Sequence, residues 1–392
     1  METFLFLCMD IALFDSPEIR TQLLPFTFTR PVAEIRVGIL TITEKWAKRG
    51  FNCGFSTQDY LQAKYFKSDS PLEINGALCP NSGLIDAIKE LKAGEELVSG
   101  DTVLARHSGG GKTVAFAGEF TLIQHTWDIF KENRGEIIAD FELLTAGRTS
   151  QEITDPHTIV YGKENLFIEE GASIRAAIIN AEGGPVYIGK NAQVHEGAII
   201  SGAFALCESA HLNMGAKIKG DTTIGPFSKV GGEIGNSVVF GYSNKGHDGY
   251  MGNSVLGEWC NLGADTNTSN LKNNYAMVKL WDYASGRFAN TGLQFCGLMM
   301  GDHSKCGINT MFNTGTVVGV GANIFGAGYP RNFVPSFSWG GANGFVTFQL
   351  RKFAEVGQAV MQRRSKDYDQ VEQDIIQHVY NETAQYRIWD KA

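Results

Sequence analysis

The sequence has little of what marks several classes of protein. Only 10 of its 392 residues are proline, so it does not resemble a proline-rich disordered chain. Its seven cysteines are scattered and form no Cys-x-x-Cys pair, which predicts reduced thiols and a cytoplasmic protein rather than a disulfide framework. The apolar run at residues 4–9 is short and lacks a basic leader. It predicts a buried strand, and neither a signal peptide nor a membrane span.

An excess of positive charge is missing as well. The formal net charge is −8 at pH 7. Because binding to a nucleic-acid backbone requires a basic surface, this charge excludes a general nucleic-acid binder. A local basic pocket for a phosphorylated substrate is still compatible with it.

Glycine is abundant instead, with 46 residues, and it follows a repeating pattern. An aliphatic residue occurs at every sixth position from 188 to 230, and glycine often comes next. A period of six fits neither an α-helix nor a simple strand, and it is the period of the hexapeptide parallel β-helix. The aliphatic series is Ile188, Val194, Ile200, Leu206, Leu212, Ile218, Ile224 and Val230.

This repeat predicts a β-helix domain at residues 151–340. Two segments break the period, at residues 241–252 and 269–291. A loop that leaves a regular coil costs no core packing, so we expect binding groups to gather on these two loops.

The flanking regions predict an α/β domain at residues 1–150 and a helical segment at residues 341–392. Strands at 103–105 and 113–116 should form a hairpin around a glycine-rich turn, and the polar stretch 145–155 should be a linker. The last two helices are amphipathic, so they should cover an end of the β-helix or pack on a neighbouring subunit, without a catalytic role. The predicted helices span 37–49, 82–92, 122–133, 350–363 and 367–386.

The first loop, at residues 241–252, carries the strongest chemical candidate. His247 stands there between glycines, and an imidazole can act as a general base near neutral pH. A lone histidine is more often an ordinary surface residue, and His195 and His211 are interpreted in that way. For His247 the residues that follow favour a functional role, because His247-x-x-Tyr250-x-Gly252 is followed by Asn-Leu-Gly-Ala at 261–264 and Thr-Ser-Asn at 268–270.

This order resembles the acetyltransferase half of the bacterial bifunctional family UDP-N-acetylglucosamine pyrophosphorylase/glucosamine-1-phosphate N-acetyltransferase, in a short alternative form. The resemblance implies a left-handed β-helix and a homotrimer with active sites between subunits. It implies acetyl transfer from acetyl-CoA to glucosamine-1-phosphate, in the synthesis of UDP-N-acetylglucosamine for the cell wall. The partners would be a sugar phosphate, acetyl-CoA and a nucleoside triphosphate, with no nucleic acid and no membrane.

The resemblance also implies roles for individual residues toward the amino sugar. His247 would be the base that deprotonates the 2-amino group. Tyr250 and Asn261 would bind the sugar, and Asn270 would contact substrate or hold the other nitrogen of the histidine. The phosphate would meet one of three lysines, each of which could equally be a solvated surface charge. These lysines are Lys245, Lys272 and Lys279.

For acetyl-CoA, the matching positions lie in later coils. Backbone groups at Ile308, Asn309, Thr310 and Gly326 would hold the pantetheine arm between two subunits. Ile308 stands where the family has serine, so a contact there would be apolar or through the backbone.

The N-terminal domain resembles the family less closely. Residues 23–31, Leu-Leu-Pro-Phe-Thr-Phe-Thr-Arg-Pro, look like the nucleotidyltransferase run in which Arg-Leu-x-Pro-Leu-Thr precedes Pro-Lys-Pro. The resemblance implies uridylyl transfer from UTP with Mg²⁺, and Arg20 and Arg30, with Arg36 a weaker candidate, would neutralise the triphosphate. The family's lysine is replaced by Val32 here.

The Mg²⁺ ligands are left open by the sequence. The family's Asn-Gly-Asp is Asn-Gly-Ala at 75–77, so a carboxylate is lost, and Asp10 or Asp15 could substitute for it. Two alternatives therefore stand beside the bifunctional enzyme. The chain could transfer a nucleotide to another sugar, for example glucose-1-phosphate with dTTP, or it could bind sugar nucleotides without turnover.

Overall fold

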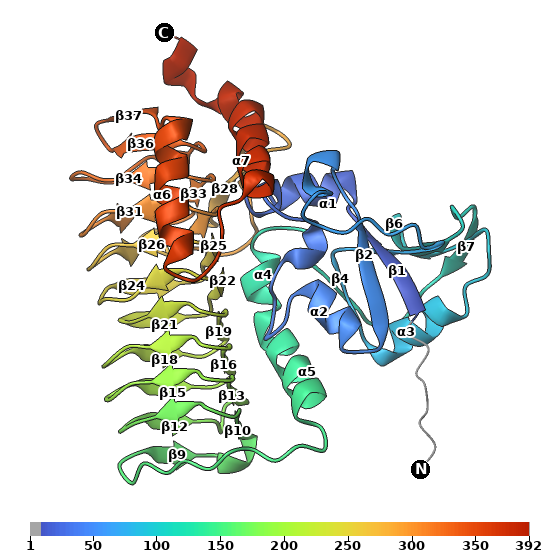
Figure 1. The fold of residues 1–392 in the computed structure, drawn as a ribbon, viewed down its shortest axis with the longest axis horizontal. Coiled ribbons are helices and arrows are strands. Elements are labelled where there is room, and N and C mark those ends of the chain that lie inside the picture. The colour runs from blue at the N-terminus through green and yellow to red at the C-terminus, as the bar shows by residue number, and fades with distance from the viewer. Residues whose placement is uncertain (1–8, 392) are drawn as a thin grey trace.

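The computed structural model describes residues 9–391 as three connected parts: an N-terminal α/β lobe, a parallel β-helix beside it, and two C-terminal helices (Figure 1). Of the strand predicted at residues 4–9, only Met9 is described, where it begins β1 (Met9–Phe14); residues 4–8 lie outside the described residues. In this described part of the chain, no helix has the length and apolar character needed to cross a membrane.

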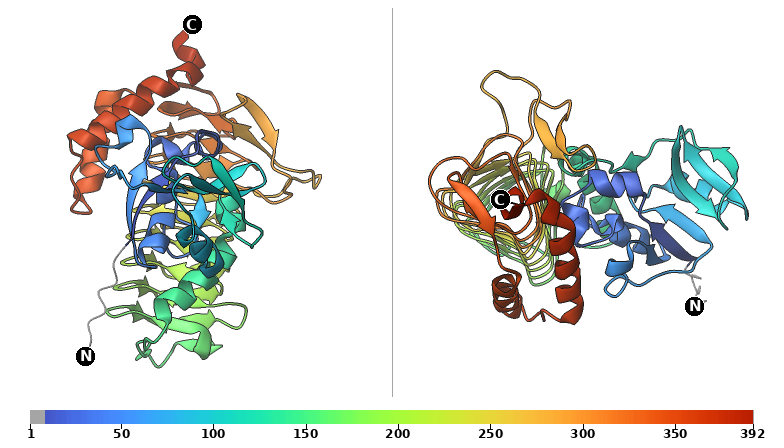
Figure 2. Two further views of the ribbon diagram at one scale, coloured as in Figure 1. Left: turned by 90° about the vertical axis from the view of Figure 1, so that its right-hand side faces the viewer. Right: turned by 90° about the horizontal axis from the view of Figure 1, so that it is seen from above.

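The coils of the β-helix pass in turn through three parallel sheets, and their stacked triangular outline is visible end-on in Figure 2. The sheet that faces the N-terminal lobe is called the lobe-side sheet. It contains β10 (Leu166–Ile168), β13 (Val186–Ile188), β16 (Phe204–Leu206), β19 (Thr222–Ile224), β22 (Val238–Gly241), β25 (Val255–Glu258), β30 (Met299–Met300), β33 (Val317–Val318) and β35 (Phe333–Val334).

The sheet beside the first C-terminal helix is called the helix-side sheet. Its last strand pairs with an antiparallel strand at the end of the prism. It contains β11 (Ser173–Ile174), β14 (Gln193–Val194), β17 (His211–Leu212), β20 (Lys229–Val230), β23 (Asn244–Lys245), β26 (Asn261–Leu262), β31 (Lys305–Cys306), β34 (Asn323–Ile324), β36 (Ser338–Gly341) and β37 (Gly344–Thr347).

The third sheet is called the open sheet, because its outward column begins with half-exposed isoleucines. Ile159, Ile178 and Ile199 lie in register there and are 39–49% exposed. It contains β9 (Ile159–Tyr161), β12 (Ile178–Asn180), β15 (Ile199–Ser201), β18 (Lys217–Lys219), β21 (Glu233–Gly235), β24 (Tyr250–Gly252), β27 (Asn267–Thr268) and β32 (Met311–Phe312).

The core of the prism confirms the period of six. All eight aliphatic residues of the series are at most 2% exposed, and Ile188, Leu206 and Ile224 lie one above another in register. Burial of each such side chain stabilises the fold by roughly 1.5–3 kcal/mol. The second loop leaves the prism as a hairpin of β28 (Lys279–Asp282) and β29 (Arg287–Asn290).

The N-terminal lobe is built on a six-stranded sheet in the order β2-β1-β3-β6-β5-β7. The predicted hairpin is wrong, because β5 lies between the two strands and pairs with both of them. The charged start of β5, Glu95-Glu96, hid this strand from the sequence analysis. The remaining strands are β2 (Phe51–Ser56), β3 (Leu72–Asn75), β5 (Glu95–Ser99), β6 (Thr102–His107), β7 (Lys112–Ala115) and a separate pair, β4 (Leu78–Cys79) and β8 (Thr121–Leu122).

Helix boundaries in the lobe follow their capping residues. α2 begins only at Ile42, because Thr41 and Glu44 form a capping box there. α3 begins as predicted, capped by Asn81. The helix predicted at 122–133 is shifted, since residues 121–122 form a strand and the helical region continues to Thr145. The helices are α1 (Pro17–Gln22), α2 (Ile42–Ala47), α3 (Ser82–Lys89), α4 (Asp128–Lys131) and α5 (Asn133–Thr145), with short 3-10 turns at Phe26–Phe28, Val32–Glu34, Asp59–Leu61 and Lys163–Asn165.

The C-terminal helices α6 (Leu350–Gln362) and α7 (Gln370–Glu382) cover the side of the prism rather than its end, which corrects the first of the two expected placements. α6 lies along the helix-side sheet, and α7 lies between the β-helix and the lobe (Figure 1). Glu372 of α7 pairs with Lys64 of the lobe at 2.5 Å, and His378 stacks on Tyr60. The chain ends in two 3-10 turns, Thr383–Tyr386 and Ile388–Lys391.

Candidate functional site

A hollow of about 680 Å³ lies between the helix-side sheet and the end of α6, and we call it the sheet–helix pocket. Its floor carries one outward side chain from each of four successive strands, because the register aligns their Cα atoms. These side chains are Lys229, Asn244, Asn261 and Lys305.

The opposite wall of the sheet–helix pocket comes from α6 and the residues just after it. Val360, Arg363 and Arg364 line it, and His247 and Ile308 lie at the corner where the helix-side sheet ends. The pocket thus places His247 and Asn261, two residues singled out in the sequence, beside a helix that the sequence analysis excluded from the chemistry.

The lining of this pocket is cationic. It includes Lys229, Lys305, Arg363 and Arg364, and no aspartate or glutamate belongs to it. Burial lowers the pKa of Lys305 to about 8, and the Lys305 ammonium donates only to the carbonyl oxygen of His303, at 2.9 Å. Burial, and then the neighbouring Arg363, lower the pKa of Arg364. The pocket therefore favours an anion.

His247 is exposed and also borders a second hollow of about 520 Å³, together with His195 and Asp248. Two side chains hydrogen-bond to the backbone of the loop that carries His247 and hold it in place. The Asn213 side-chain amide donates to the carbonyl oxygen of Gly246 at 2.7 Å, and Lys245 donates to that of His247 at 2.8 Å. Among residues 9–391 the imidazole itself has no hydrogen-bond partner, so both ring nitrogens are available to ligands.

The predicted phosphate ligands are not at either hollow. Lys245 is 1% exposed, and its ammonium donates to three backbone carbonyl oxygens, so we reassign it to holding the loop. Lys272 contacts the carbonyl oxygen of Met277 in the second loop, and Lys279 lies on β28. Neither lysine lines a hollow that contains His247.

Tyr250 and Asn270 lie together on the open sheet, away from the sheet–helix pocket. The Asn270 amide donates to the Tyr250 hydroxyl at 2.9 Å and to the Asn253 side-chain oxygen at 2.8 Å, rather than to the imidazole. Burial raises the pKa of Tyr250. Within one chain, the structure thus divides the proposed sugar-binding residues between two faces of the prism.

Of the four residues expected to bind acetyl-CoA, only Ile308 lines the sheet–helix pocket, where it is 71% exposed. The Asn309 N–H donates to the carbonyl oxygen of Ala264 at 2.8 Å. The Thr310 hydroxyl is buried and donates to the carbonyl oxygen of Gly307 at 2.8 Å. Gly326 is exposed in a left-handed conformation. An apolar contact is therefore what Ile308 can offer a ligand.

The arginines expected to neutralise triphosphate are both buried, Arg30 against the β-helix and Arg20 among residues of the lobe. Arg30 is 4% exposed and pairs with Asp302 and, at 3.5 Å, with Glu258. Arg20 donates to the Tyr60 hydroxyl at 2.7 Å and lies 3.6 Å from Asp15. Both guanidinium groups are buried and pair with other groups of the chain, so the structure does not support the predicted role for either arginine.

Arg36 is likewise an interface residue, because its guanidinium donates to the carbonyl oxygen of Phe240 at 3.0 Å. The sequence pattern could not show the contacts of Arg30 and Arg36 with the β-helix, since they join residues more than 200 positions apart.

A crevice of about 470 Å³ lies at the carboxyl ends of β1, β2 and β3, where α/β sheets bind nucleotides. Asp15, Asn75, Asp101 and Arg106 line it. The Asp15 carboxylate already accepts from the Thr57 hydroxyl at 2.5 Å and from the Val32 N–H at 2.8 Å.

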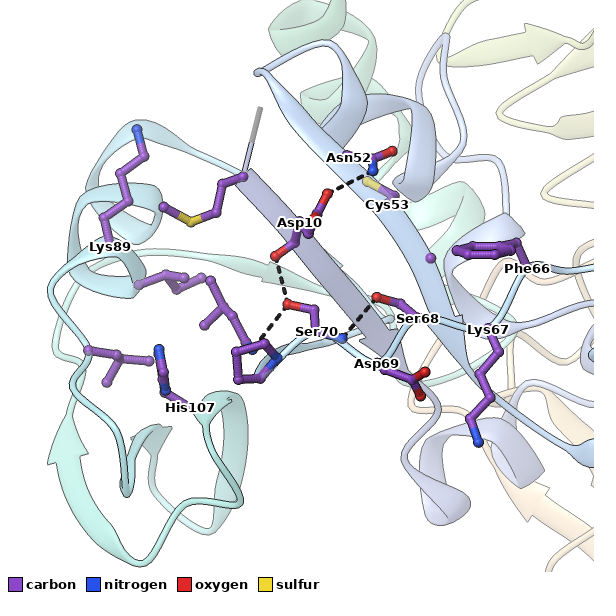
Figure 3. Close-up of a pocket in the computed structure, with 16 residues that line it drawn as sticks. Asp10, Asn52, Cys53, Phe66, Lys67, Ser68, Asp69, Ser70, Lys89 and His107 are labelled. Carbon is purple, nitrogen blue, oxygen red and sulfur yellow. Dashed lines mark hydrogen bonds between the residues drawn. The ribbon is translucent and has the colours of Figure 1, made fainter. Parts of the chain in front are cut away.

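Asp10, the other substitute considered for a Mg²⁺ ligand, lies at the opposite end of β1 in a separate hollow (Figure 3). Its carboxylate accepts from Asn52 at 2.7 Å. Residues 9–391 contain no group of three or more His, Cys, Asp or Glu residues that could hold a metal ion. Mg²⁺ in nucleotide sites is held by one or two carboxylates together with phosphate oxygens, and the carboxylates that line the crevice are those of Asp15 and Asp101.

The four cations of the sheet–helix pocket were missed by the sequence analysis. A signal for two of them existed, because Lys229 and Lys305 directly precede the inward residues Val230 and Cys306 and so point outward. The sequence has no comparable signal for Arg363 and Arg364, since the repeat does not specify where α6 docks.

Residues 11–149 match the family described as sugar nucleotidyl transferase. One curated relative is a bifunctional sugar-1-phosphate nucleotidylyltransferase/acetyltransferase from Sulfurisphaera tokodaii, 27% identical over 144 residues, or 36% of this chain and 35% of that protein. Another is a bifunctional protein GlmU from Methanocaldococcus jannaschii, 34% identical over 87 residues, or 22% and 21% of the two chains. The chain spans about a third or less of the length of the curated relatives it matches.

These matches confirm the resemblance to the bifunctional family at low identity and over part of the chain. Among solved structures, an Arabidopsis UDP-N-acetylglucosamine acyltransferase is 18% identical, with a TM-score of 0.24 over 52% of this chain and 76% of that one. The N-acyltransferase AntD from Bacillus cereus, in complex with dTDP and 3-hydroxybutyryl-CoA, is 14% identical, with a TM-score of 0.24 over 53% and 92%.

Proposed function

We propose that this chain, in which a sugar nucleotidyl transferase domain precedes a parallel β-helix, acts in sugar-nucleotide biosynthesis as a glucosamine-1-phosphate N-acetyltransferase. The observation that carries the proposal is the place of His247, whose unpaired imidazole borders two hollows, one of them lined by four cations. Two substrates that occupy the two hollows would meet at this imidazole.

The reaction follows from the chemistry of an imidazole beside an amine and a thioester. A ring nitrogen of His247 accepts a proton from the 2-amino group as the amine nitrogen attacks the carbonyl carbon of acetyl-CoA. The new N–C bond forms, the C–S bond breaks, and the CoA thiolate takes up the proton from the imidazolium. Lys245 and Asn213 would keep the imidazole in place during both proton transfers.

The test is His247→Ala in the full chain, supplied with acetyl-CoA and glucosamine-1-phosphate, with the release of CoA thiol as the readout. Loss of general-base catalysis should lower kcat by about 10²–10⁴-fold. His211→Ala is the matched control, because His211 lies on the same sheet and lines neither hollow. Full acetyl transfer by the His247→Ala variant would disprove this mechanism.

We also propose that the chain works as a homotrimer with acetyl-CoA bound between subunits. The half-exposed Ile159, Ile178 and Ile199 on the open sheet support a contact between chains, since an apolar column of this kind is a typical subunit contact. Light scattering should give three times the mass of one chain. A monomer that is fully active at assay concentration would contradict this proposal.

A second candidate function rests on the crevice at the ends of β1–β3 and on the family match of residues 11–149. The lobe would bind a nucleotide or sugar nucleotide there and, if it turns over, transfer uridylyl from UTP. Asp15 and Asp101 are the carboxylates there that would hold a Mg²⁺ ion, and we derive no catalytic step through the ion. Release of pyrophosphate with UTP and N-acetylglucosamine-1-phosphate would indicate uridylyl transfer, and release only with dTTP and glucose-1-phosphate would indicate the other sugar. Binding without pyrophosphate would indicate a non-catalytic lobe.

A further inference from the structure

Two separate parts of the chain bring positive charge to the same side of His247. The β-helix supplies Lys229 and Lys305, which stand three strands apart on one outward column. The segment after α6 supplies Arg363 and Arg364, more than 50 residues later in the sequence. The four cations come together only in the tertiary fold, because the six-residue repeat of the β-helix does not specify where the segment after α6 lies.

The position of the arginines is fixed by the packing of α6. Phe353 of α6 lies 5.3 Å from Phe337 and 5.5 Å from His303, measured between ring centroids. Met361, next to the end of the helix, is 5% exposed. The Arg364 guanidinium also contacts the side-chain oxygen of Asn244 on the pocket floor, at 3.4 Å.

Within residues 9–391, no carboxylate forms an ion pair with any of the four cations. Ion pairs of 4.0 Å or less involve many other lysines and arginines of the chain, and none of these four. Because no carboxylate lines the pocket, repulsion between the four cations is left uncompensated there. A bound anion would provide the missing charge.

We propose that Lys229, Lys305, Arg363 and Arg364 form a phosphate-binding subsite beside His247, and that the end of α6 therefore belongs to the active site. Guanidinium groups bind phosphate through paired N–H donors, and ammonium groups add point charge. The hollow has a volume within the range of small-molecule sites. The subsite replaces the three lysines that the sequence suggested for this task.

The phosphate could come from either substrate, the sugar-1-phosphate or the phosphorylated end of the acyl-CoA. This identity of the ligand rests on the proposed acetyl transfer, whereas the binding of a phosphate does not. Calorimetry on the full chain separates the two sources, with glucosamine-1-phosphate and free CoA titrated in separate experiments and inorganic phosphate as a reference.

The variants are Arg363→Gln/Arg364→Gln and, separately, Lys229→Gln/Lys305→Gln. Each should weaken the binding of one of the two ligands by roughly ten- to a hundredfold, since charge-assisted hydrogen bonds are lost. Arg351→Gln is the matched control, because Arg351 lies on the same helix, is exposed and pairs with Glu355. Weakening for the sugar phosphate assigns the subsite to the sugar, and weakening for CoA assigns it to the acyl donor.

Unchanged affinity for both ligands in both folded double variants would overturn the subsite. If either double variant failed to fold, the single variants Arg364→Gln and Lys229→Gln would take its place, and binding by the wild-type protein must weaken as NaCl rises. The result is independent of the acetyl-transfer mechanism. If His247→Ala kept full activity while the charge variants lost binding, the subsite would stand and the proposed role of His247 would not.

Discussion

The ammonium of Lys245 donates a hydrogen bond of 2.8 Å to the carbonyl oxygen of His247, two residues further along the chain. Two more carbonyl oxygens, of Gly231 and Asp248, accept from the same ammonium at 3.2 Å. All three acceptors are neutral, and within residues 9–391 this ammonium forms no ion pair with a carboxylate. A buried, charged side chain thus holds the loop that carries the His247 imidazole.

Replacing Lys245 by methionine should therefore reduce both acetyl transfer and stability. The loop would lose three hydrogen bonds and His247 its fixed position, so we expect kcat to fall at least about tenfold, while the free energy of unfolding changes by no more than roughly 1–3 kcal/mol. Initial rates and urea unfolding measure the two effects. An unchanged kcat would contradict the positioning role, and Lys352→Met, on the exposed face of α6, is the control.

The same lysine should also leave a signature in the pH dependence of stability. Burial lowers the pKa of Lys245 from 10.5 to about 8, so between these values the unfolded chain binds more protons than the folded one. The contribution of Lys245 to the free energy of unfolding must then rise as the pH increases from 8 to 10.5.

Comparing variants isolates this effect from that of other groups that titrate in the same range. The wild-type protein should gain stability relative to Lys245→Met between pH 8 and 10.5, by up to roughly 3 kcal/mol. Lys305, whose pKa burial also lowers to about 8, should behave in the same way in Lys305→Met. If the difference in free energy of unfolding between wild type and either variant stayed constant from pH 8 to 10.5, burial would not lower the pKa of that lysine in solution.

The pair of Arg30 and Asp302 joins the lobe to the β-helix, and its loss should destabilise the whole chain. Arg30→Met leaves the Asp302 carboxylate buried and unpaired, which costs roughly 3–5 kcal/mol, and Arg30→Met/Asp302→Leu should recover part of this loss. Urea unfolding measures it. If Arg30 instead bound triphosphate, Arg30→Met would weaken UTP binding and leave the free energy of unfolding unchanged.

This pair also predicts a loss of stability in acid. Burial alone would raise the pKa of Asp302, but the Arg30 guanidinium and the Thr29 hydroxyl lower it below 3.8 overall. A carboxylate with a lowered pKa in the folded state contributes stability above its unfolded pKa and loses it as the pH falls through the folded one. The gap between wild type and Asp302→Asn should therefore close below pH 4.

The β-helix could be predicted in detail because its core repeats. The period of six gave both the inward residues and the outward columns, so Lys229 and Lys305 could have been placed on the surface of the helix-side sheet. The same register pairs Lys245 with Val230, an inward position, so its burial was also readable in principle. It was missed because lysine is rarely buried, and that general tendency outweighed the local repeat.

The remainder of the site depends on contacts that no repeat encodes. α6 had a recognisable apolar stripe, but several faces of the prism could have received it, so Arg363 and Arg364 could not be placed. Arg30 lay in a motif that implied a nucleotide ligand, and only the docking of the lobe on Asp302 reveals its partner. Sequence analysis therefore identified the imidazole but not the charged groups around it.

Tyr250 and Asn270 allow a test of whether the open sheet contributes to the sugar site. Tyr250→Phe removes the hydroxyl that accepts from Asn270, so we expect the KM for glucosamine-1-phosphate to rise about three- to tenfold while the KM for acetyl-CoA stays constant. Steady-state kinetics with each substrate varied in turn measures the two KM values separately. Tyr161→Phe, on the same sheet and half-exposed, is the control. An equal change in both KM values would indicate a general disturbance of the fold.

Two glycine substitutions test why the coils need glycine at their corners. A Cβ atom at Gly225 would lie 2.0 Å from the carbonyl oxygen of Phe240 in the next coil, so Gly225→Ala must push two coils apart. We expect a loss of at least roughly 1–3 kcal/mol in the free energy of unfolding. Gly135, in α5, has no atom within 4 Å of such a Cβ, and Gly135→Ala should stabilise the chain by roughly 0.5–1 kcal/mol through its higher helix propensity. Thermal and urea unfolding of the two variants should thus shift in opposite directions. If Gly225→Ala left the free energy of unfolding unchanged or raised it, coil spacing would not limit position 225.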